Sequence, residues 1–271
     1  MPEYRNRPLM DPATPVWRYL SLNAVVATVR DRKLRFTRVD TFPDPFEGSV
    51  PKQQIDDQLL TFSSHYTTRS EWSMAPGDDP GVLERLSEDP WVRMTRLRRA
   101  QTRAAHASCW SWGEESESLW RLYSDEDGVR GLGVALRTTL GKLDTSLAAH
   151  DLYVSPVIYR PYHVGPAFTD ERDPFMHKRR GFRAEQELRL LHWDNAQYLG
   201  LFNVPPSVSE VDPHLFLDWL PANVVEEIVL SPYADEPYEQ RARAAIAAAD
   251  PALDVPVSLS ELNPRRYAPG F

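Results

Sequence analysis

The sequence predicts a mixed α/β fold of the α+β class, formed by a single domain with a helical insertion. Separated segments in which apolar and polar residues alternate indicate β-strands, and segments with apolar residues at helical spacing lie between them. The composition, 42% hydrophobic and 26% charged, is that of a globular protein with a sizeable core. Because 271 residues lie near the upper limit of what one core serves, we expect residues 1–271 to form one domain.

The N-terminal part predicts two strands around one helix. VWRYLSL predicts a short strand that leads into a helix over about Asn23 to Asp31. KLRFTRV alternates apolar and polar residues with a period of two, which indicates a half-buried strand. TFPDPFEGS follows with two prolines and a glycine, so we expect a loop there.

Residues 51–105 differ from the rest of the chain and predict the helical insertion. The stretch SMAPGDDPG separates two expected helices. The second helix, WVRMTRLRRAQTRA, carries arginines at helical neighbour spacing, namely Arg93, Arg96, Arg98, Arg99 and Arg103. Two interpretations of these arginines stay open, a solvated helix face and a contact with nucleic acid.

The middle of the chain predicts closely spaced elements. HASCWSW predicts a strand, GEESESLWRLY a helix whose acidic start suits the positive end of the helix dipole, and GVRGLGVAL a further strand. YVSPVIYRPY then predicts an extended segment.

The last part of the chain begins with a predicted strand, FRAEQELRLLHW. Alternation places Glu185, Glu187 and Arg189 on one face of this strand and the apolar residues on the other. EEIVLSP predicts another strand, followed by a helix from about Glu236 to Ala249 and a short strand at VPVSL.

Charge and residue usage exclude several functional classes. A net charge of −8 with a pI near 5.4 argues against wholesale electrostatic binding to nucleic acid or to an anionic membrane. The single cysteine, Cys109, cannot form an internal disulfide, and no apolar run approaches the length of a membrane span. We therefore expect a cytoplasmic protein.

Metal and nucleotide-loop motifs are missing from the sequence. The histidines form no pair at metal-ligand spacing and there is no cysteine pair, so we expect no metal site. The GVRGLG stretch leads into a strand and not into a phosphate-binding helix, which argues against the dehydrogenase and kinase classes.

The first candidate for chemistry is Arg18, between Trp17 and Tyr19 on the opening strand. Its fixed fork of donors suits a phosphate or a carboxylate. The alternative is a surface arginine that lies across an aromatic ring.

The second candidate is the segment from Ser108 to Ser111. We expect both serines on one strand face, where two hydroxyls can bind a ribose or an amide. Alternatively, the hydroxyls satisfy backbone groups at a strand end. Cys109, next to Trp110, is more typical of a packed small hydrophobe than of a nucleophile.

The third candidate is the pair Glu185 and Glu187. Two carboxylates on one strand face perturb each other's pKa and bring an acid to a substrate hydroxyl. The alternative is a solvent-facing strand in which Arg189 compensates the two acids.

In their order along the chain, several motifs resemble the bacterial family known as domain of unknown function 2971. That family has a Tyr-Arg start, a Phe-x-Asp-Pro-Phe-Glu loop, a Ser-Cys-Phe-Ser strand, a Trp-x-x-Tyr helix and a Glu-x-Glu-x-Arg strand. The matching residues here include Phe42, Asp44, Pro45, Phe46, Glu47, Trp120 and Tyr123, while Trp110 replaces the usual phenylalanine.

The same order of motifs is similar to the Arg-Ser-Glu class of ADP-ribosyltransferases. The resemblance implies strands around a cleft in which Arg18, beside Tyr19, holds NAD and Ser108 positions the nicotinamide ribose. It implies that Glu187 stabilises the ribosyl cation and that Glu185 orients or deprotonates an acceptor. The motif is Ser-Cys-Trp-Ser and not Ser-Thr-Ser, so Ser111 is an alternative to Ser108; the candidates for stacking on nicotinamide are Trp120 and Tyr123.

The resemblance implies NAD-dependent ADP-ribosyl transfer or NAD hydrolysis, in a toxin or phage-defence setting. NAD is then the substrate, no metal is needed, and the acceptor is an unidentified protein or nucleic acid. Two alternatives stay open, a non-catalytic nucleotide- or protein-binding module on the same fold, and a nucleic-acid-binding protein that uses the basic helix of the insertion.

Overall fold

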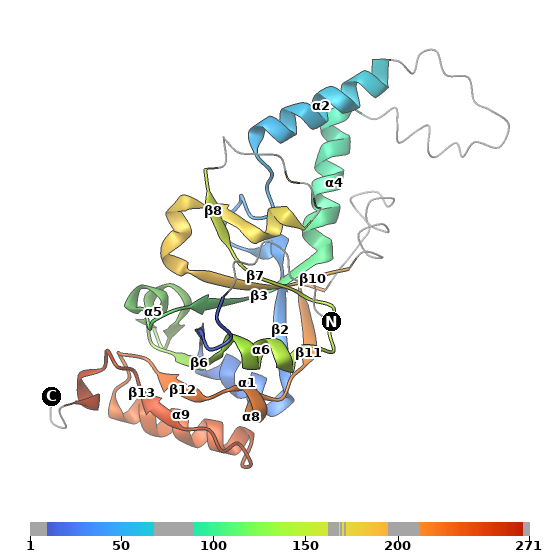
Figure 1. Cartoon of the computed structure of the whole chain (residues 1–271). Helices are drawn as coiled ribbons and strands as arrows, with labels where there is room; N and C mark the ends of the chain where they lie inside the picture. The colour runs from blue at the N-terminus through green and yellow to red at the C-terminus, as the bar shows by residue number, and fades with distance from the viewer. Residues whose placement is uncertain are drawn as a thin grey trace.

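The computed structural model describes residues 10–67, 89–161, 168, 170, 172–194 and 212–267. Over these residues the chain combines helices with one large mixed sheet (Figure 1), which confirms the predicted α+β fold class. The SMAPGDDPG stretch of the insertion lies outside the described residues.

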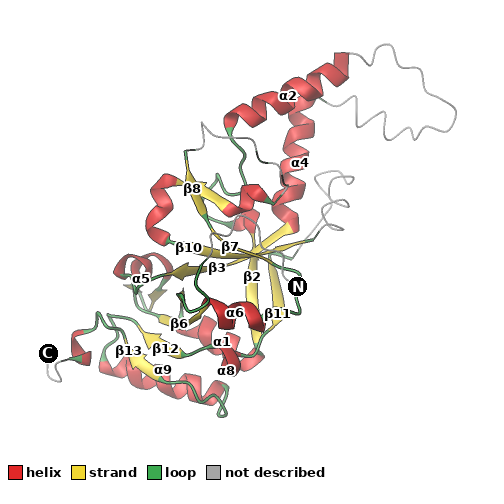
Figure 2. Cartoon of the chain, in the orientation of Figure 1, coloured by secondary structure: helices red, strands yellow, loops and turns green. Residues whose placement is uncertain are grey.

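Nine described strands form the central sheet, in the order β11-β2-β3-β1-β6-β12-β13, with β10 pairing β3 and β7 pairing β10 (Figure 2). Only β12 and β13 run parallel; the other pairs are antiparallel. The strands are β1 (Pro15–Leu20), β2 (Lys33–Arg38), β3 (Ala105–Trp112), β6 (Val134–Thr139), β7 (Tyr153–Pro156), β10 (Glu187–Trp193), β11 (His214–Asp218), β12 (Glu227–Leu230) and β13 (Val257–Leu259). Two further pairs lie outside this sheet, β4 (Asp125–Glu126) with β5 (Val129–Arg130) and β8 (Ile158–Arg160) with β9 (His177–Arg179).

The helices begin at polar caps where the sequence supplies them. Ser21 Oγ accepts a hydrogen bond from the N–H of Ala24, and the Asp235 carboxylate accepts one from the N–H of Tyr238. The α-helices are α1 (Leu22–Asp31), α2 (Lys52–Thr67), α4 (Pro90–Ala104), α5 (Glu117–Tyr123), α6 (Leu140–Ser146), α8 (Pro221–Val224) and α9 (Glu236–Ala249). The 3₁₀ helices are η1 (Val39–Thr41), η3 (Asp173–Met176), η4 (Arg180–Glu185) and η5 (Pro264–Arg266). Among the described helices, none has the length and apolar character needed to cross a bilayer.

Most predicted elements are present, and the main error concerns the late strand. That strand begins only at Glu187, because residues Arg180–Glu185 form a 3₁₀ helix and Gln186 then adopts the left-handed conformation with φ of 43°. The helix predicted at GEESESLWRLY begins only at Glu117. Strand β11 and helix α6 were not predicted, since neither segment has a long periodic pattern.

The sheet divides at β3. One edge of β3 pairs with β10 from Ala105 to Ser111, so β1 and β2 must share the opposite edge. Strand β1 pairs with β3 at Ser111 and Trp112, and β2 pairs with it at His106 and Ala107. Between these two contacts β1 and β2 separate, which leaves an opening beside the middle of β3.

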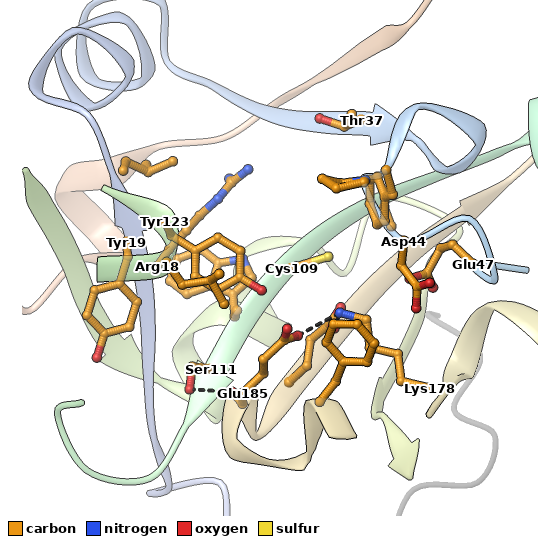
Figure 3. Close-up of a pocket in the computed structure, with 18 of the residues that line it drawn as sticks. Arg18, Tyr19, Thr37, Asp44, Glu47, Cys109, Ser111, Tyr123, Lys178 and Glu185 are labelled. Atoms are coloured by element: carbon orange, nitrogen blue, oxygen red, sulfur yellow. Dashed lines mark hydrogen bonds and ion pairs between the residues drawn. The ribbon is translucent and has the colours of Figure 1, made fainter. Parts of the chain in front are cut away.

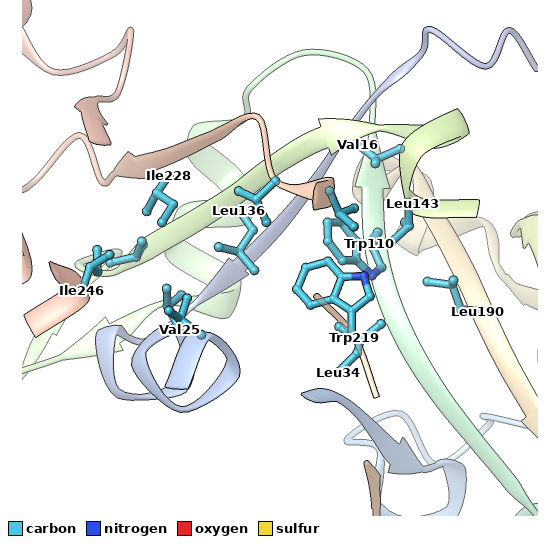
Figure 4. Close-up of a cluster of buried hydrophobic side chains, with 14 of the residues drawn as sticks. Val16, Val25, Leu34, Trp110, Leu136, Leu143, Leu190, Trp219, Ile228 and Ile246 are labelled. Atoms are coloured by element: carbon cyan, nitrogen blue, oxygen red, sulfur yellow. The ribbon is translucent and has the colours of Figure 1, made fainter. Parts of the chain in front are cut away.

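The main core lies on one side of this sheet, under helices α1 and α9 (Figure 4). Strand alternation directs Trp110, Leu136 and Leu190 into this core, where Trp110 contacts Trp219 edge to face at a centroid distance of 6.3 Å. The core therefore fixes which residues of β3 and β10 face the opposite side.

Helices α2 and α4 occupy the region of the predicted insertion and contact each other away from the main core (Figure 1). Asp89 caps α4 by accepting from the N–H groups of Trp91 and Val92. Two arginines of α4 contact other parts of the protein: Arg98 donates a hydrogen bond to Ser49 Oγ at 2.6 Å, and Arg103 lies 3.6 Å from the Asp40 carboxylate. These contacts join α4 to the sheet body.

Gly133 occupies a close approach at the start of β6 and provides a test of this packing. A Cβ added there would lie 2.6 Å from the Leu20 carbonyl oxygen and 2.7 Å from the Ser124 side chain. We expect Gly133→Ala to lower the free energy of unfolding by about 1–3 kcal/mol in urea denaturation. Gly181→Ala is the control, because no atom lies within 4 Å of its added Cβ; an equal loss in both variants would contradict the prediction.

Candidate functional site

A cavity of about 460 Å³ lies at the opening between β1 and β2 (Figure 3). Its walls come from β1, β2, β3, the end of α5, the loop after η1, β9, η4 and the start of β10. This volume is within the range of small-molecule sites. Segments far apart in the sequence therefore meet at one concave surface.

Arg18 lies at the β1 side of the cavity and is buried. Its Nη2 donates to the Arg35 carbonyl oxygen at 2.8 Å, across the opening between β1 and β2. Its guanidinium also lies over the Trp110 ring, 5.8 Å from the centroid. Burial, and then the charge of Arg35, lower the pKa of Arg18 to about 10.

No carboxylate among the described residues forms an ion pair with Arg18. Its pKa still keeps the guanidinium charged at neutral pH. A buried charge without a counter-ion is costly unless a ligand supplies one. The Arg18 end of the cavity thus favours an anionic group.

The two predicted serines lie on opposite faces of β3, which corrects the expectation that they share one. Residues three apart in a strand have opposite orientations. Ser108 has no exposed surface and is not among the residues that line the cavity. Ser111 does line the cavity, and its hydroxyl donates to the Glu185 carbonyl oxygen at 2.9 Å.

Glu185 and Glu187 both line the cavity and are joined by Lys178. Lys178 Nζ lies 2.6 Å from Glu185 Oε2 and 2.8 Å from Glu187 Oε2. The two acids do not share a strand face as predicted, because Glu185 ends η4 and Glu187 begins β10. The turn at Gln186 and the common lysine bring their carboxylates together instead.

Arg189 lies behind these acids and is fully buried. Its Nε donates to Glu187 Oε1 at 2.7 Å, and its Nη1 donates to Glu47 Oε1 at 2.5 Å and to the Phe175 carbonyl oxygen. One guanidinium thus connects β10, the loop after η1, and η3.

The ionisation of Glu187 follows from this network. Burial opposes its charge, but Arg189 and Lys178 outweigh burial and lower the pKa to about 2. Glu187 is therefore a fixed negative charge at neutral pH. Its contribution to stability is present above its ordinary pKa of 4.5 and is lost as the pH falls toward 2.

The pKa of Glu47 shifts in the opposite direction from that of Glu187. Burial raises its pKa above the ordinary value, although Arg189 acts in the opposite direction. The loop that carries it is held by Asp44, whose Oδ1 accepts from the N–H of Phe46 at 3.0 Å and from Arg179 at 2.8 Å. The conformation of this loop places Glu47 at the cavity wall.

The aromatic candidates separate into two groups. Trp120 is fully buried against Tyr19 with its Nε1 donating to Glu115, so it does not line the cavity and cannot stack on a ligand there. Tyr19 reaches the cavity wall, but its hydroxyl accepts from the N–H of Ser116. Tyr123 lines the cavity, and burial together with Glu185 and Glu187 raises its pKa.

Cys109, which follows Ser108 on β3, lines the cavity. Burial, followed by the charge of Glu187, raises the pKa of its thiol. Because the thiolate is the nucleophilic form, this cysteine is a poor nucleophile at neutral pH. Among the residues that the structure describes, no group of three or more His, Cys, Asp or Glu side chains is arranged to hold a metal ion.

Sequence reasoning missed three charged residues of the site. Lys178 lies in a short strand outside the central sheet, and no pattern in the sequence points to it. Glu47 was noted only as part of the Phe-x-Asp-Pro-Phe-Glu loop, and Arg189 only as the residue that compensates the two acids on a solvent-facing strand. The Glu-x-Glu-x-Arg motif was the one available signal for Arg189.

No protein-family model, curated protein or solved structure matches this chain. The candidate site is consequently defined by its own geometry and charge.

Arg189 provides a stability test of the buried network. Arg189→Met leaves Glu47 and Glu187 buried without this partner, so we expect the free energy of unfolding at pH 7 to fall by about 3–5 kcal/mol. The exposed pair of Arg30 with Asp31 is the control, and Arg30→Met is expected to leave the free energy of unfolding almost unchanged. Urea denaturation measures both changes; a similar small loss in each variant would contradict the buried role of Arg189.

Proposed function

We propose that this protein cleaves the bond between nicotinamide and ribose in NAD and transfers the ADP-ribosyl group to water or to a macromolecular acceptor. The observation that carries the proposal is that Arg18, Ser111 and Glu187 line one cavity. The cavity has a buried cation without an ion-pair partner among the described residues at one end, and carboxylates that include the ionised Glu187 at the other. NAD carries groups that suit each end.

The Arg18 end suits the pyrophosphate. The guanidinium has five N–H donors, of which one is used on the Arg35 carbonyl oxygen. The remaining donors can bind phosphate oxygens in the bidentate manner that arginine favours. Arg35 lines the same cavity and adds a second positive charge.

The Glu187 end suits the reacting ribose. When the glycosidic bond breaks, the bonding electron pair leaves with neutral nicotinamide and positive charge develops on the ribose. A carboxylate that is already ionised and fixed in place stabilises this charge more than it stabilises the bound substrate. The pairs with Arg189 and Lys178 hold Glu187 in position for this role.

Glu185 is suited to the acceptor. The attacking group forms a bond to the ribose carbon and loses a proton, which a neighbouring carboxylate can accept. Glu185 lies next to Glu187 through Lys178, and Ser111 fixes its backbone by donating to its carbonyl oxygen. Tyr123 presents the exposed aromatic ring of the cavity wall, which suits contact with nicotinamide.

Removal of Arg18 tests the phosphate assignment. We expect Arg18→Met to raise the dissociation constant of NAD about 30-fold or more, because removing one partner of a buried charge pair costs at least about 2 kcal/mol. Isothermal titration calorimetry measures the affinity, with Arg30→Met as the control at an exposed position. Equal affinities for NAD in wild type and Arg18→Met would exclude this role.

The two carboxylates should have separable effects on the reaction. Glu187→Gln keeps the shape and removes the charge, so we expect nicotinamide release from NAD to fall by about 10²–10³ while NAD still binds. Glu185→Gln is expected to spare hydrolysis and to reduce transfer, because a macromolecular acceptor depends more on a base than water does.

The measurement for both variants is nicotinamide release, with and without cell extract as the source of acceptor. Wild-type release by Glu187→Gln would rule out its catalytic role. Binding of NAD without release, even by the wild type, would instead favour a non-catalytic nucleotide-binding module.

A further inference from the structure

Glu47 has an unused hydrogen-bond acceptor inside the cavity. Its Oε1 accepts from Arg189, whereas its Oε2 is buried and has no hydrogen-bond partner among the described residues. The residue lines the cavity wall with only 7% of its surface exposed. A buried acceptor that remains unsatisfied costs about 1–3 kcal/mol or more, which a ligand hydrogen bond would recover.

Glu187 lines the same cavity and also has an oxygen with remaining acceptor capacity. Its Oε1 accepts from Arg189 Nε. Its Oε2 lies within ion-pair distance of Lys178 Nζ at 2.8 Å, but it makes no hydrogen bond with the part of the protein described here. A carboxylate oxygen has two lone-pair positions, so this oxygen can accept from a ligand while it remains near Lys178.

The two carboxylates are held by one rigid group. Arg189 is planar and fully buried, and it anchors Glu47 through Nη1 and Glu187 through Nε. The inner oxygen of each carboxylate is therefore fixed; the outer oxygen of Glu47 has no hydrogen-bond partner among the described residues, and that of Glu187 has Lys178 Nζ at 2.8 Å. The ligand that fits such a pair presents two neighbouring hydrogen-bond donors.

We propose that Glu47 and Glu187 together bind the two adjacent hydroxyls of a ribose, so that Glu47 is a substrate-binding residue and the substrate class is a ribonucleotide. This inference rests on the proposed function in one respect: Glu187 is assigned to the 2′-hydroxyl of the nicotinamide ribose, which leaves the 3′-hydroxyl for Glu47. Hydroxyls donate to carboxylate oxygens, which have acceptor capacity beyond the bonds that they make with Arg189 and Lys178. A site built this way discriminates against a ligand that lacks one hydroxyl.

The same pair accounts for the position of the loop after η1. Asp44 holds the loop through the N–H of Phe46 and through Arg179, and Glu47 then turns toward Arg189.

The experiment measures binding of ADP-ribose, which carries the ribose but no nicotinamide bond to cleave. Calorimetry compares it with an analogue that lacks the 3-hydroxyl of the terminal ribose, in wild type, Glu47→Ala and Glu47→Gln. We expect wild type to bind ADP-ribose about 10- to 100-fold more tightly than the analogue. Glu47→Ala should bind the two ligands equally, and Glu47→Gln should retain only a reduced preference.

Two controls separate ligand contact from a structural effect. Glu227→Gln changes a carboxylate that is also paired with an arginine, Arg137, but lies outside the cavity, so its preference should equal that of wild type. Thermal unfolding is measured for each variant; if Glu47→Ala does not fold, Glu47→Gln keeps the side-chain length and a carbonyl oxygen for Arg189. If Glu47 only positioned Arg189, removal of the Glu47 carboxylate and removal of the ligand hydroxyl would have additive effects on the free energy of ligand binding.

The outcomes distinguish this inference from the proposed reaction. A preference for the 3-hydroxyl that persists in both Glu47 variants, or the absence of ADP-ribose binding by wild type, overturns ribose recognition by Glu47. Nicotinamide release from NAD is measured in parallel on wild type. If nicotinamide release is absent while the preference for the hydroxyl depends on Glu47, the cleavage reaction is excluded and ribose recognition by Glu47 stands. If release occurs and the preference does not depend on Glu47, ribose recognition by Glu47 is excluded and the cleavage reaction stands.

Discussion

The buried guanidinium of Arg189 is the interaction on which the candidate site depends. A charge that is fully removed from water must be matched by acceptors, and here the acceptors are Glu187, Glu47 and the Phe175 carbonyl oxygen. Glu47 and Arg189 are 142 residues apart in the sequence. The loop after β2 is thereby held against β10, and the wall of the cavity follows from that connection.

The charges around the cavity are unevenly distributed. Arg18 and Arg35 lie on the β1 and β2 strands, whereas Glu47, Glu185 and Glu187 gather near Lys178. Glu187 is ionised beside Lys178 and Arg189, so this end favours neutral donors or developing positive charge in a ligand. A ligand with an anionic middle and a sugar that becomes cationic complements both ends.

The sequence predicted the fold class and part of the site, and the failures have identifiable causes. Periodicity located β1, α1, β2 and α9 because each has a regular apolar pattern with defined ends. The prediction that Ser108 lines the site together with Ser111 was wrong, because residues three apart in a strand lie on opposite faces. Ser111 lines the cavity and Ser108 does not.

Local sequence patterns do not identify other residues of the site. Glu185 reaches the cavity through a 3₁₀ helix and a left-handed Gln186, which no alternation rule anticipates. Lys178 enters from a strand of three residues whose sequence has no periodic signal. Such residues are brought to the site by tertiary contacts, so only the assembled fold identifies them.

The pairing of β10 with β3 also determines when the site can exist. Strand β10 supplies Glu187 and Arg189, and it meets β3 across roughly eighty intervening residues, a contact that forms slowly because it must close a long loop. A chain on the ribosome that has been synthesised only through β6 already contains Arg18 and Ser111 but neither Lys178 nor the carboxylates of η4 and β10. The nascent protein consequently lacks the full set of Lys178, Glu185 and Glu187 until more than two thirds of its length has been synthesised, so this wall of the cavity is completed late.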